Sequence, residues 1–369
     1  MTLLTLALAA AFLVPPGVVI DHQPAASRQY VGSPSIVKIP GGDYLATHDL
    51  FGPQSGQTTS AVTRVFKSSD RGKTWRQVAE FPEQFWSNLF LHHGQIYLMG
   101  TNYEYGRIVI RRSKDGVVWS APSYLTTGTG FHTAPVPIVE KDGRLWRAME
   151  YHPAGPWGSF QAFLISIDAK ADLLDAKNWT MTPRLPYQGG SGGTTWLEGN
   201  AVIGPDGSLL DILRVNDLEK AAITRFQDGA LVFEKLIDFP GGAKKFTIRY
   251  DRKSHRYWTL SNPALAQFPK SATNPASVRN TLALLSSADL EHWTTERIVL
   301  SHPDPEKHAF QYVDWQFEGN DIIAVSRTAF DDEEGGAHRG HDANFMTFHR
   351  ISQFRKNPKK ALQSSSKIR

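Results

Sequence analysis

The most informative stretch of this chain is Ser68-Ser69-Asp70-Arg71-Gly72-Lys73-Thr74-Trp75. Its first serine and its aspartate carry short polar side chains that suit hydrogen bonds to backbone amides within a tight turn, and its glycine suits a positive φ. Residues 62–66, just before it, alternate apolar and polar side chains, as a half-buried strand does. The stretch is therefore predicted to be a hairpin turn, after which Trp75 packs back against that strand.

The pattern of this turn returns twice in weaker form. The copies are Ser113-Lys114-Asp115-Gly116-Val117-Val118-Trp119 and Ser287-Ala288-Asp289-Leu290-Glu291-His292-Trp293. Both keep the serine, the aspartate and the tryptophan. We expect such turns to be structural and to carry no chemistry. Their recurrence instead indicates a repeated unit.

The repeated unit is a run of short strands separated by turns such as Lys141-Asp142-Gly143 and Pro205-Asp206-Gly207. Units start near residues 33, 87, 132, 196, 245 and 310, and a period of about 50 residues is typical of β-propellers. We therefore predict an all-β protein, a single β-propeller with six four-stranded blades. The count would be seven blades if the N-terminal segment formed part of a further blade and did not complete the last one. Residues 169–177 are the one short helix expected.

The composition narrows the class of protein. The chain has 369 residues, 41% of them hydrophobic and 21% charged, as in ordinary globular proteins. Its net charge of +4 is spread without a dense basic run before residue 356, so no nucleic-acid partner is expected. The pI of about 9.1 fits an anionic substrate. The absence of cysteine excludes disulfides, thiolate nucleophiles and cysteine-based zinc sites.

The two ends of the chain differ from its middle. Residues 1–20 are largely apolar, and we interpret residues 1–22 as a secretory signal peptide, with an N-terminal strand or anchor as the alternative. Residues 28–355 are predicted to form the propeller, as the catalytic domain, and residues 356–369 a flexible basic tail. No later run approaches the ~20 apolar residues of a membrane span. We therefore expect a secreted or periplasmic monomer with no membrane partner.

The propeller prediction also sorts the polar residues. The first two strands of a blade run antiparallel, so the start of the first and the end of the second open on the same face. These positions are nearly all polar or ionisable, whereas strand interiors such as residues 209–213 are largely apolar. This face is the predicted site, a concave pocket with converging polar groups.

Histidines supply the first candidates for catalysis. His132 and His152 bracket one hairpin of the third unit, and such a pair can share proton abstraction and charge stabilisation. They could also be two separate structural histidines. His48 follows a strand of the first unit and precedes Asp49, which suits either an acid/base pair or a loop cap.

Arg214 and Glu198 are the other two catalytic candidates. Arg214 ends a strand of the fourth unit, where its forked guanidinium would grip a carboxylate, unless it pairs with Asp217 or Glu219. Glu198 begins the same unit and should face Arg214. It is either a general acid or base or the salt-bridge partner of Arg214.

The remaining site predictions concern binding. Candidate substrate-binding residues at the same face are Tyr151, Trp196, Asn200, Asn262 and Arg327, of which Asn200 could instead bond a neighbouring blade. His341 and Asp342 could bind a metal near the central channel, although their spacing matches no tight ligand motif. No cofactor is expected to be required, and a structural or channel Ca²⁺ is the cation considered.

The turn at residues 68–75 matches every specified position of the Asp-box, Ser-x-Asp-x-Gly-x-Thr-Trp, and with its repeats the chain resembles the sialidase-like propeller superfamily. A sialidase implies an arginine triad on the substrate carboxylate, a Tyr/Glu nucleophile pair and an Arg-Ile-Pro motif near the start. The first unit here reads Val37-Lys38-Ile39-Pro40, without arginine. Because no triad is evident either, a sialidase is the weaker interpretation.

A closer resemblance is to the propeller group of ulvan lyases, rhamnose–glucuronate lyases and α-L-rhamnosidases. It is carried by Gly32-Ser33-Pro34-Ser35 with His48, by His132 and His152, and by Arg214 after Trp196-Leu197-Glu198-Gly199-Asn200. In the lyases two histidines, a tyrosine and an arginine act on a uronate. The histidines and Arg214 match in order and spacing, but the tyrosine position falls on or near Glu198.

The sequence therefore predicts a secreted enzyme that cleaves a glycosidic bond at a uronic acid in an acidic polysaccharide. As a lyase, it would use Arg214 to neutralise the uronate and one of His132 and His152 to remove the C5 proton. As a rhamnosidase-like hydrolase, it would use Glu198 or His48 to assist attack by water. The alternatives are a sialidase-like exo-glycoside hydrolase and a non-catalytic glycan-binding propeller.

Overall fold

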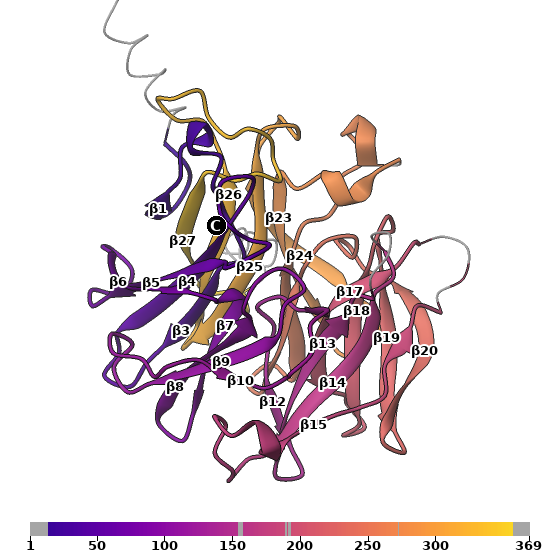
Figure 1. Ribbon diagram of the computed structural model, residues 1–369. Helices are drawn as coiled ribbons and strands as arrows, with labels where there is room; N and C mark the ends of the chain where they lie inside the picture. The colour runs from indigo at the N-terminus through magenta and orange to yellow at the C-terminus, as the bar shows by residue number, and fades with distance from the viewer. Residues whose placement is uncertain (1–13, 154–157, 189, 191–192, 272, 357–369) are drawn as a thin grey trace, which may run out of the picture.

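The computed structural model describes residues 14–153, 158–188, 190, 193–271 and 273–356. These residues form a six-bladed β-propeller, in which each blade is an antiparallel sheet of four to six strands (Figure 1). Helix in this part of the chain is limited to four 3-10 turns, at Ala25–Ser27, Ala176–Asn178, Pro269–Ser271 and Pro275–Ser277. The predicted fold class, all-β with six blades, is confirmed.

The first three blades follow one another along the chain. Blade 1 contains β2 (Tyr30–Val31), β3 (Ser35–Lys38), β4 (Tyr44–Phe51), β5 (Val62–Ser68) and β6 (Arg76–Pro82). Blade 2 contains β7 (Phe85–His92), β8 (Gln95–Thr101), β9 (Ile108–Ser113) and β10 (Ser123–Tyr124). Blade 3 contains β11 (Phe131–His132), β12 (Val139–Lys141), β13 (Arg144–Tyr151), β14 (Gln161–Asp168), β15 (Trp179–Met181) and β16 (Leu185–Pro186).

The other three blades complete the ring. Blade 4 contains β17 (Trp196–Ile203), β18 (Leu209–Val215), β19 (Lys220–Gln227) and β20 (Ala230–Asp238). Blade 5 contains β21 (Thr247–Asp251), β22 (Arg256–Ser261), β23 (Thr281–Ser287) and β24 (Thr294–Ser301). Blade 6 contains β25 (Ala309–Glu318), β26 (Asp321–Ala329), β27 (Phe345–Ile351) and β1 (Val18–His22). First strands of neighbouring blades contact one another, as β3 does with β7 and β25, so they surround the central axis.

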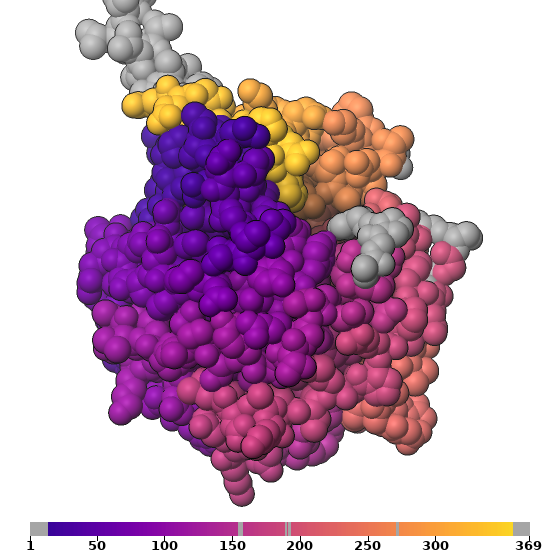
Figure 2. Space-filling model, in the orientation of Figure 1, coloured from indigo at the N-terminus to yellow at the C-terminus, as the bar shows by residue number. Residues whose placement is uncertain are grey.

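The N-terminal strand closes this ring. β1 pairs with β27 as the outermost strand of blade 6, so the indigo and yellow ends of the described chain lie side by side (Figures 1 and 2). Asp21 on β1 accepts hydrogen bonds from His48 Nε2 at 2.8 Å and from Arg64 at 3.2 Å, both in blade 1. The N-terminal segment therefore completes the last blade and does not add to a seventh.

The start of the propeller differs from the predicted boundary at residue 28. Val18–His22 lie within the predicted signal peptide but form β1, and Ile20 is buried in the core between blades 1 and 6. This is the N-terminal strand that the sequence left as the alternative. The signal peptide itself remains a prediction, and residues 1–13 and 357–369 lie outside the described residues. Among the described residues, no helix is long and apolar enough to cross a membrane.

The three Ser-x-Asp turns share one hydrogen-bond pattern. Asp70 Oδ1 accepts from the amides of Lys73 at 3.0 Å and Thr74 at 2.9 Å, and Asp115 and Asp289 each accept from two amides in the same way. In every turn the tryptophan Nε1 donates back to a carbonyl of the turn. Half-buried Trp75 packs on the core cluster that contains Phe66, as predicted. These contacts are structural.

The helix expected over residues 169–177 is not formed. The structure has turns there, followed by the 3-10 helix Ala176–Asn178. Asp172 accepts from the amide of Leu174 at 3.2 Å, and Asp175 accepts from the amide of Lys177 at 3.0 Å. Such local side-chain bonds compete with helical ones, which explains why the expectation was wrong.

Candidate active site

A cavity of about 300 Å³ opens at one face of the propeller, where the blades meet. Its lining comes mainly from the starts of first strands and from the ends of second strands, the two positions singled out from the sequence. The residues are Gly32, Ser33, Asp49, Phe51, Gln57, Phe85, Trp86, Glu104, Tyr105, His132, Leu197, Glu198, Arg214, Asn216, Ala276, Arg279, Tyr312, Arg327 and His341. Six blades thus contribute to one small, polar chamber.

Three of these side chains enter the cavity from a β-bulge. Trp86, Glu198 and Tyr312 have φ of 47°, 55° and 54°, and each lies where the pairing of the first strand with the second shifts register. Positive φ is rare for residues other than glycine, and bulges near active sites re-aim a side chain. Blades 2, 4 and 6 therefore use the same device to turn one residue toward the axis.

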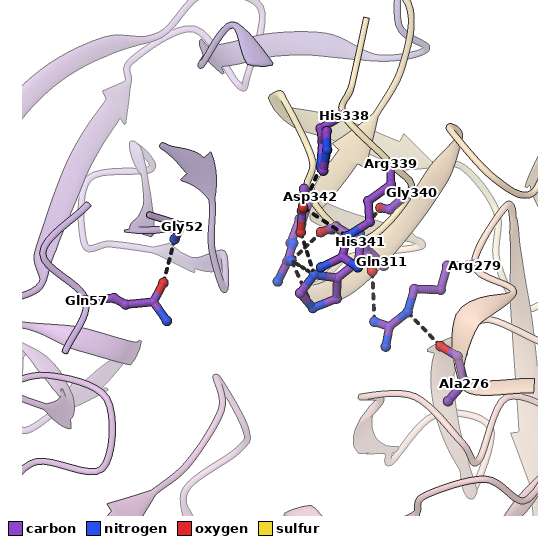
Figure 3. Close-up of polar contacts among 11 residues, drawn as sticks. Gly52, Gln57, Ala276, Arg279, Gln311, His338, Arg339, Gly340, His341 and Asp342 are labelled. Atoms are coloured by element: carbon purple, nitrogen blue, oxygen red, sulfur yellow. Dashed lines mark hydrogen bonds and ion pairs between the residues drawn. The ribbon is translucent and has the colours of Figure 1, made fainter. Parts of the chain in front are cut away.

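Three arginines line the cavity. Arg214 donates to Glu198 Oε2 at 2.7 Å, and both side chains are 4% exposed. Arg279 donates to Gln311 Oε1 and to the carbonyl of Ala276, both at 2.8 Å. Figure 3 draws these contacts of Arg279. Arg327 donates to the carbonyl of His341.

Two of these guanidinium groups lack an acidic partner. Neither Arg279 nor Arg327 forms an ion pair with any described residue, and both are nine-tenths or more buried, at 7% and 4% exposed. Burial lowers the pKa of Arg327 to about 10, and the neighbouring charge of Arg279 acts in the same direction. A buried positive charge without a counter-ion is costly, so this side of the cavity favours an anionic ligand.

Tyr312 lies among the three arginines. The guanidinium carbons of Arg327 and Arg279 are 4.8 Å and 5.4 Å from the centroid of its ring. Burial lowers the pKa of Arg214, but the charge of Glu198 and the phenol of Tyr312 outweigh it and raise that pKa above its usual range. The side chain of Tyr312 is therefore surrounded by three guanidinium groups.

Glu198 is ionised in this site. Its burial raises the pKa of the carboxyl group, but the charge of Arg214, followed by that of His132, outweighs burial and holds the pKa below its usual range. Glu198 is thus both the salt-bridge partner of Arg214 and a carboxylate that could take up a proton inside the cavity. The salt bridge to Arg214, one of the two alternatives left open by the sequence, is formed, and the role as a general acid or base stays a prediction.

The pKa of Asp49 is shifted in the opposite direction to that of Glu198. Burial raises its pKa to about 7, although the charge of His48 and the amide of Ser33 act against burial. Oδ1 accepts from the amide of Ser33 at 3.0 Å, whereas buried Oδ2 has no hydrogen-bond partner among the described residues. A pKa near neutrality would let Asp49, beside the cavity, give or take up a proton close to pH 7, as a general acid must.

Of the two candidate histidines, His132 lines the cavity and His152 does not. The Nδ1 atom of His132 bonds Glu150 Oε2 at 2.8 Å. The other oxygen of Glu150 accepts from the amide of Gly199 at 2.9 Å, so one carboxylate holds both His132 and the bulge of Glu198. His152 does not line the cavity, but Tyr105, which does, stacks on it at 4.6 Å and lies 6.2 Å from His132.

Five other residues predicted for catalysis or substrate binding lie outside the cavity lining: His48, Tyr151, Trp196, Asn200 and Asn262. His48 is fully buried, with one ring nitrogen on Asp21 and the other on the carbonyl of Asp49. The buried amides of Asn200 and Asn262 bond backbone groups of the next blade.

The two aromatic residues of this group also have protein partners. Trp196 is fully buried in the core between blades 3 and 4. Tyr151 lies under the guanidinium of Arg184, 3.4 Å from its ring centroid.

The predicted metal ligands have protein partners. Asp342 Oδ1 bonds His341, and Asp342 Oδ2 accepts from His338 and Arg339, each at 2.9 Å (Figure 3). Arg339 already neutralises the carboxylate that a cation would need. No group of three or more metal-binding side chains occurs in the described part of the chain.

Sequence reasoning did not single out Arg279, Tyr312 or Tyr105 as site residues, and it missed the raised pKa of Asp49. Tyr312 could have been found, because it starts a blade at the same position as Glu198. Arg279 had no such signal, since it lies in the connection between β22 and β23. The sequence analysis found no arginine triad, with no arginine in the first strand of blade 1. Three arginines do converge on the cavity, but none of them comes from that strand.

Comparison with solved structures places the fold among known propellers. Penicillium chrysogenum α-L-arabinanase, solved with arabinobiose, is 14% identical, with a TM-score of 0.56 over 92% of this chain and 98% of its own. Trypanosoma rangeli sialidase with the inhibitor DANA is 12% identical, with a TM-score of 0.61 over 92% of this chain but 57% of its own. A Fusarium graminearum α-L-arabinofuranosidase is 11% identical, with a TM-score of 0.59 over 91% and 97%.

These likenesses define the class by fold. The chain is a six-bladed β-propeller, similar in fold to a sialidase and an arabinanase. No family model and no curated protein matches it in sequence. What this particular propeller does must therefore be argued from its own cavity.

Proposed function

We propose that the protein is an exo-acting glycoside hydrolase that releases a terminal sugar acid, with Tyr312 as its nucleophile. The observation that carries the proposal is the convergence of Arg214, Arg279 and Arg327 on the cavity that holds Tyr312. At about 300 Å³ the cavity is at the lower limit of ligand pockets, which suits one terminal sugar better than a threaded chain.

The arginines would hold the carboxylate of the sugar acid. Arg279 and Arg327 lack a carboxylate partner among the described residues, and a guanidinium fork matches a carboxylate in geometry and charge. Arg214 is already paired with Glu198, so its main task would be to hold that base and to face the phenol of Tyr312.

The first chemical step would form a bond between Tyr312 and the sugar. Glu198 takes the phenol proton while the oxygen of Tyr312 attacks the anomeric carbon, and Asp49 gives its proton to the departing glycosidic oxygen. Tyrosine nucleophiles are a known exception to the carboxylate nucleophile in glycoside hydrolysis. In this step the tyrosine–carbon bond forms and the glycosidic bond breaks.

The second step would return the enzyme to its starting state. Asp49, now ionised, takes a proton from a water molecule that attacks the anomeric carbon. The tyrosine–carbon bond breaks, and the phenol oxygen regains its proton from Glu198. Two displacements retain the anomeric configuration. The fold neighbours support this class of reaction, since an arabinanase, an arabinofuranosidase and a sialidase are among them.

The test is a panel of terminal glycosides that differ in their acidic group. Purified protein should cleave a nonulosonic acid glycoside or a uronide, and should not cleave the matched carboxyl-reduced glycoside or an α-L-arabinofuranoside. Tyr312→Phe should abolish turnover and keep the melting temperature of the wild type. Cleavage of the neutral glycosides instead would overturn the sugar-acid assignment, and full activity of Tyr312→Phe would overturn the nucleophile.

Elimination at a uronate in an acidic polysaccharide is the second candidate. The observation that favours it is Tyr105, which lines the cavity and packs on both His132 and His152, as a lyase tyrosine would. Against it, burial raises the pKa of Tyr105 well above its usual value, which opposes its use as a base. Absorbance of an unsaturated uronate in the product would favour elimination over hydrolysis. Both candidate functions include secretion of the enzyme as part of the proposal.

A further inference from the structure

Two grooves leave the cavity, one on each side of residues 338–342. The 52–58 groove has a volume of about 740 Å³ and shares Phe51, Gln57 and His341 with the cavity. The 274–279 groove has a volume of about 500 Å³ and shares Asn216, Ala276, Arg279 and His341 with it. Figure 3 shows residues 338–342 between Gly52 and Gln57 on one side and Ala276 and Arg279 on the other.

The segment that divides the grooves is fixed in place. Gln311 donates to the carbonyl of Gly340, and Arg327 donates to the carbonyl of His341. Asp342 accepts from His338 and Arg339 within the segment, each at 2.9 Å. Because the segment is bonded to the floor of the cavity, a ligand that extends beyond the cavity must follow one groove or the other.

The positions of Asp49 and Arg279 decide between the grooves. Asp49 lies on β4, and the same strand continues through Phe51 into the wall of the 52–58 groove. Arg279 lies at the entrance of the opposite groove. A sugar whose carboxylate is held at Arg279 would therefore direct its leaving oxygen, which Asp49 protonates, toward Phe51.

From this geometry we propose that the 52–58 groove binds the sugar unit of the leaving group; the inference rests on the proposed hydrolase function. The groove presents Phe51 and Tyr30, whose ring centroids are 5.4 Å apart, and His338 stacks on Tyr30 at 6.1 Å. Ligand pockets commonly pair aromatic walls with a few polar groups that fix orientation. Gln57 supplies a polar group at the entrance, held by the amide of Gly52 and by Glu104.

A pair of matched substitutions tests the assignment. Thr58 lines the 52–58 groove and Ser277 lines the 274–279 groove, and both side chains are exposed, so Thr58→Trp and Ser277→Trp should each fill a groove without unfolding the protein. Two substrates of one sugar acid are compared for each variant. One is linked to lactose and the other is the glycosyl fluoride, whose leaving group needs no groove.

The expected result is selective. Thr58→Trp should lower kcat/KM on the lactose-linked substrate by roughly tenfold or more and leave the fluoride within about twofold, while Ser277→Trp should change neither. Selective loss in Ser277→Trp, or in neither variant, would overturn the groove assignment and leave the hydrolase proposal standing. Failure of the wild type to cleave either substrate would overturn both proposals.

Discussion

The Nζ atom of Lys245 donates a hydrogen bond of 2.9 Å to the carbonyl of Val313, the residue that follows Tyr312 in the bulge of β25. Lys245 is 1% exposed and has no carboxylate partner among the described residues; its other bond is to Thr247. Next along the bulge, Asp314 is bonded to Ser35 in blade 1 and to Arg249 in blade 5. The left-handed conformation of Tyr312 is thus held from both neighbouring blades, as a strained residue at a functional site must be.

Removing this lysine should impair catalysis through the position of Tyr312. We expect Lys245→Met to lower kcat by roughly tenfold or more with little change in KM, because the arginines that bind the carboxylate stay in place. Lys244→Met is the matched control: Lys244 is equally buried but bonds Glu219 and Pro275, away from Tyr312. Equal kcat losses in both variants would show a general loss of stability and no positioning role.

The two arginines without acidic partners give the sharpest test of carboxylate recognition. Arg279→Lys and Arg327→Lys keep the charge but lose the fork, so each should lower kcat/KM on a sugar-acid substrate by roughly tenfold, about 1.4 kcal/mol. Arg214→Lys is a less specific test of carboxylate binding, because it also disturbs the hydrogen bond to Glu198. Turnover of the carboxyl-reduced substrate, poor in the wild type, should not fall further. An equal loss on both substrates would contradict carboxylate binding.

The pH profile should report Asp49. A general acid works only while protonated, and burial raises the pKa of Asp49 to about 7, so kcat/KM should fall as the pH rises above about 7. Asp49→Asn should lose this limb and most of kcat/KM on sugar leaving groups. It should spare kcat/KM on the glycosyl fluoride, which reports the first step, but should lower kcat on it because the second step loses its base. A wild-type profile that stays flat to pH 9, measured with the same substrate, would remove Asp49 from the mechanism.

Ring closure should depend on the ion pair between β1 and blade 1. Asp21→Asn removes the charge that His48 and Arg64 face, and should lower the free energy of unfolding by about 2 kcal/mol. Burial raises the pKa of Asp21, but His48 and Arg64 outweigh it and lower that pKa from 3.8 to about 2. A lowered pKa contributes stability above pH 3.8 that is lost as the pH falls toward 2.

Denaturant unfolding at pH 7 and pH 3 measures both effects. Asp228→Asn, in an exposed turn, is the control and should behave as the wild type does. Identical unfolding curves for Asp21→Asn and the wild type would mean that the pair adds nothing to closure.

The sequence by itself determined the blade repeat, because hairpin turns and the Ser-x-Asp turns are local and depend on residues a few positions apart. It also placed Glu198, Arg214 and His132 on one face, since hairpin turns mark where strands end and the first two strands of a blade run antiparallel. These residues do line the cavity.

Only the tertiary structure brought Asp49, Arg279 and Tyr312 together, because they come from blades 1, 5 and 6 and meet through closure of the ring. The positive φ that turns Tyr312 inward is imposed by Lys245 and Asp314 through contacts between blades, and no local residue preference announces it. The raised pKa of Asp49 likewise arises from burial, which depends on how the blades pack and not on its neighbours in the chain.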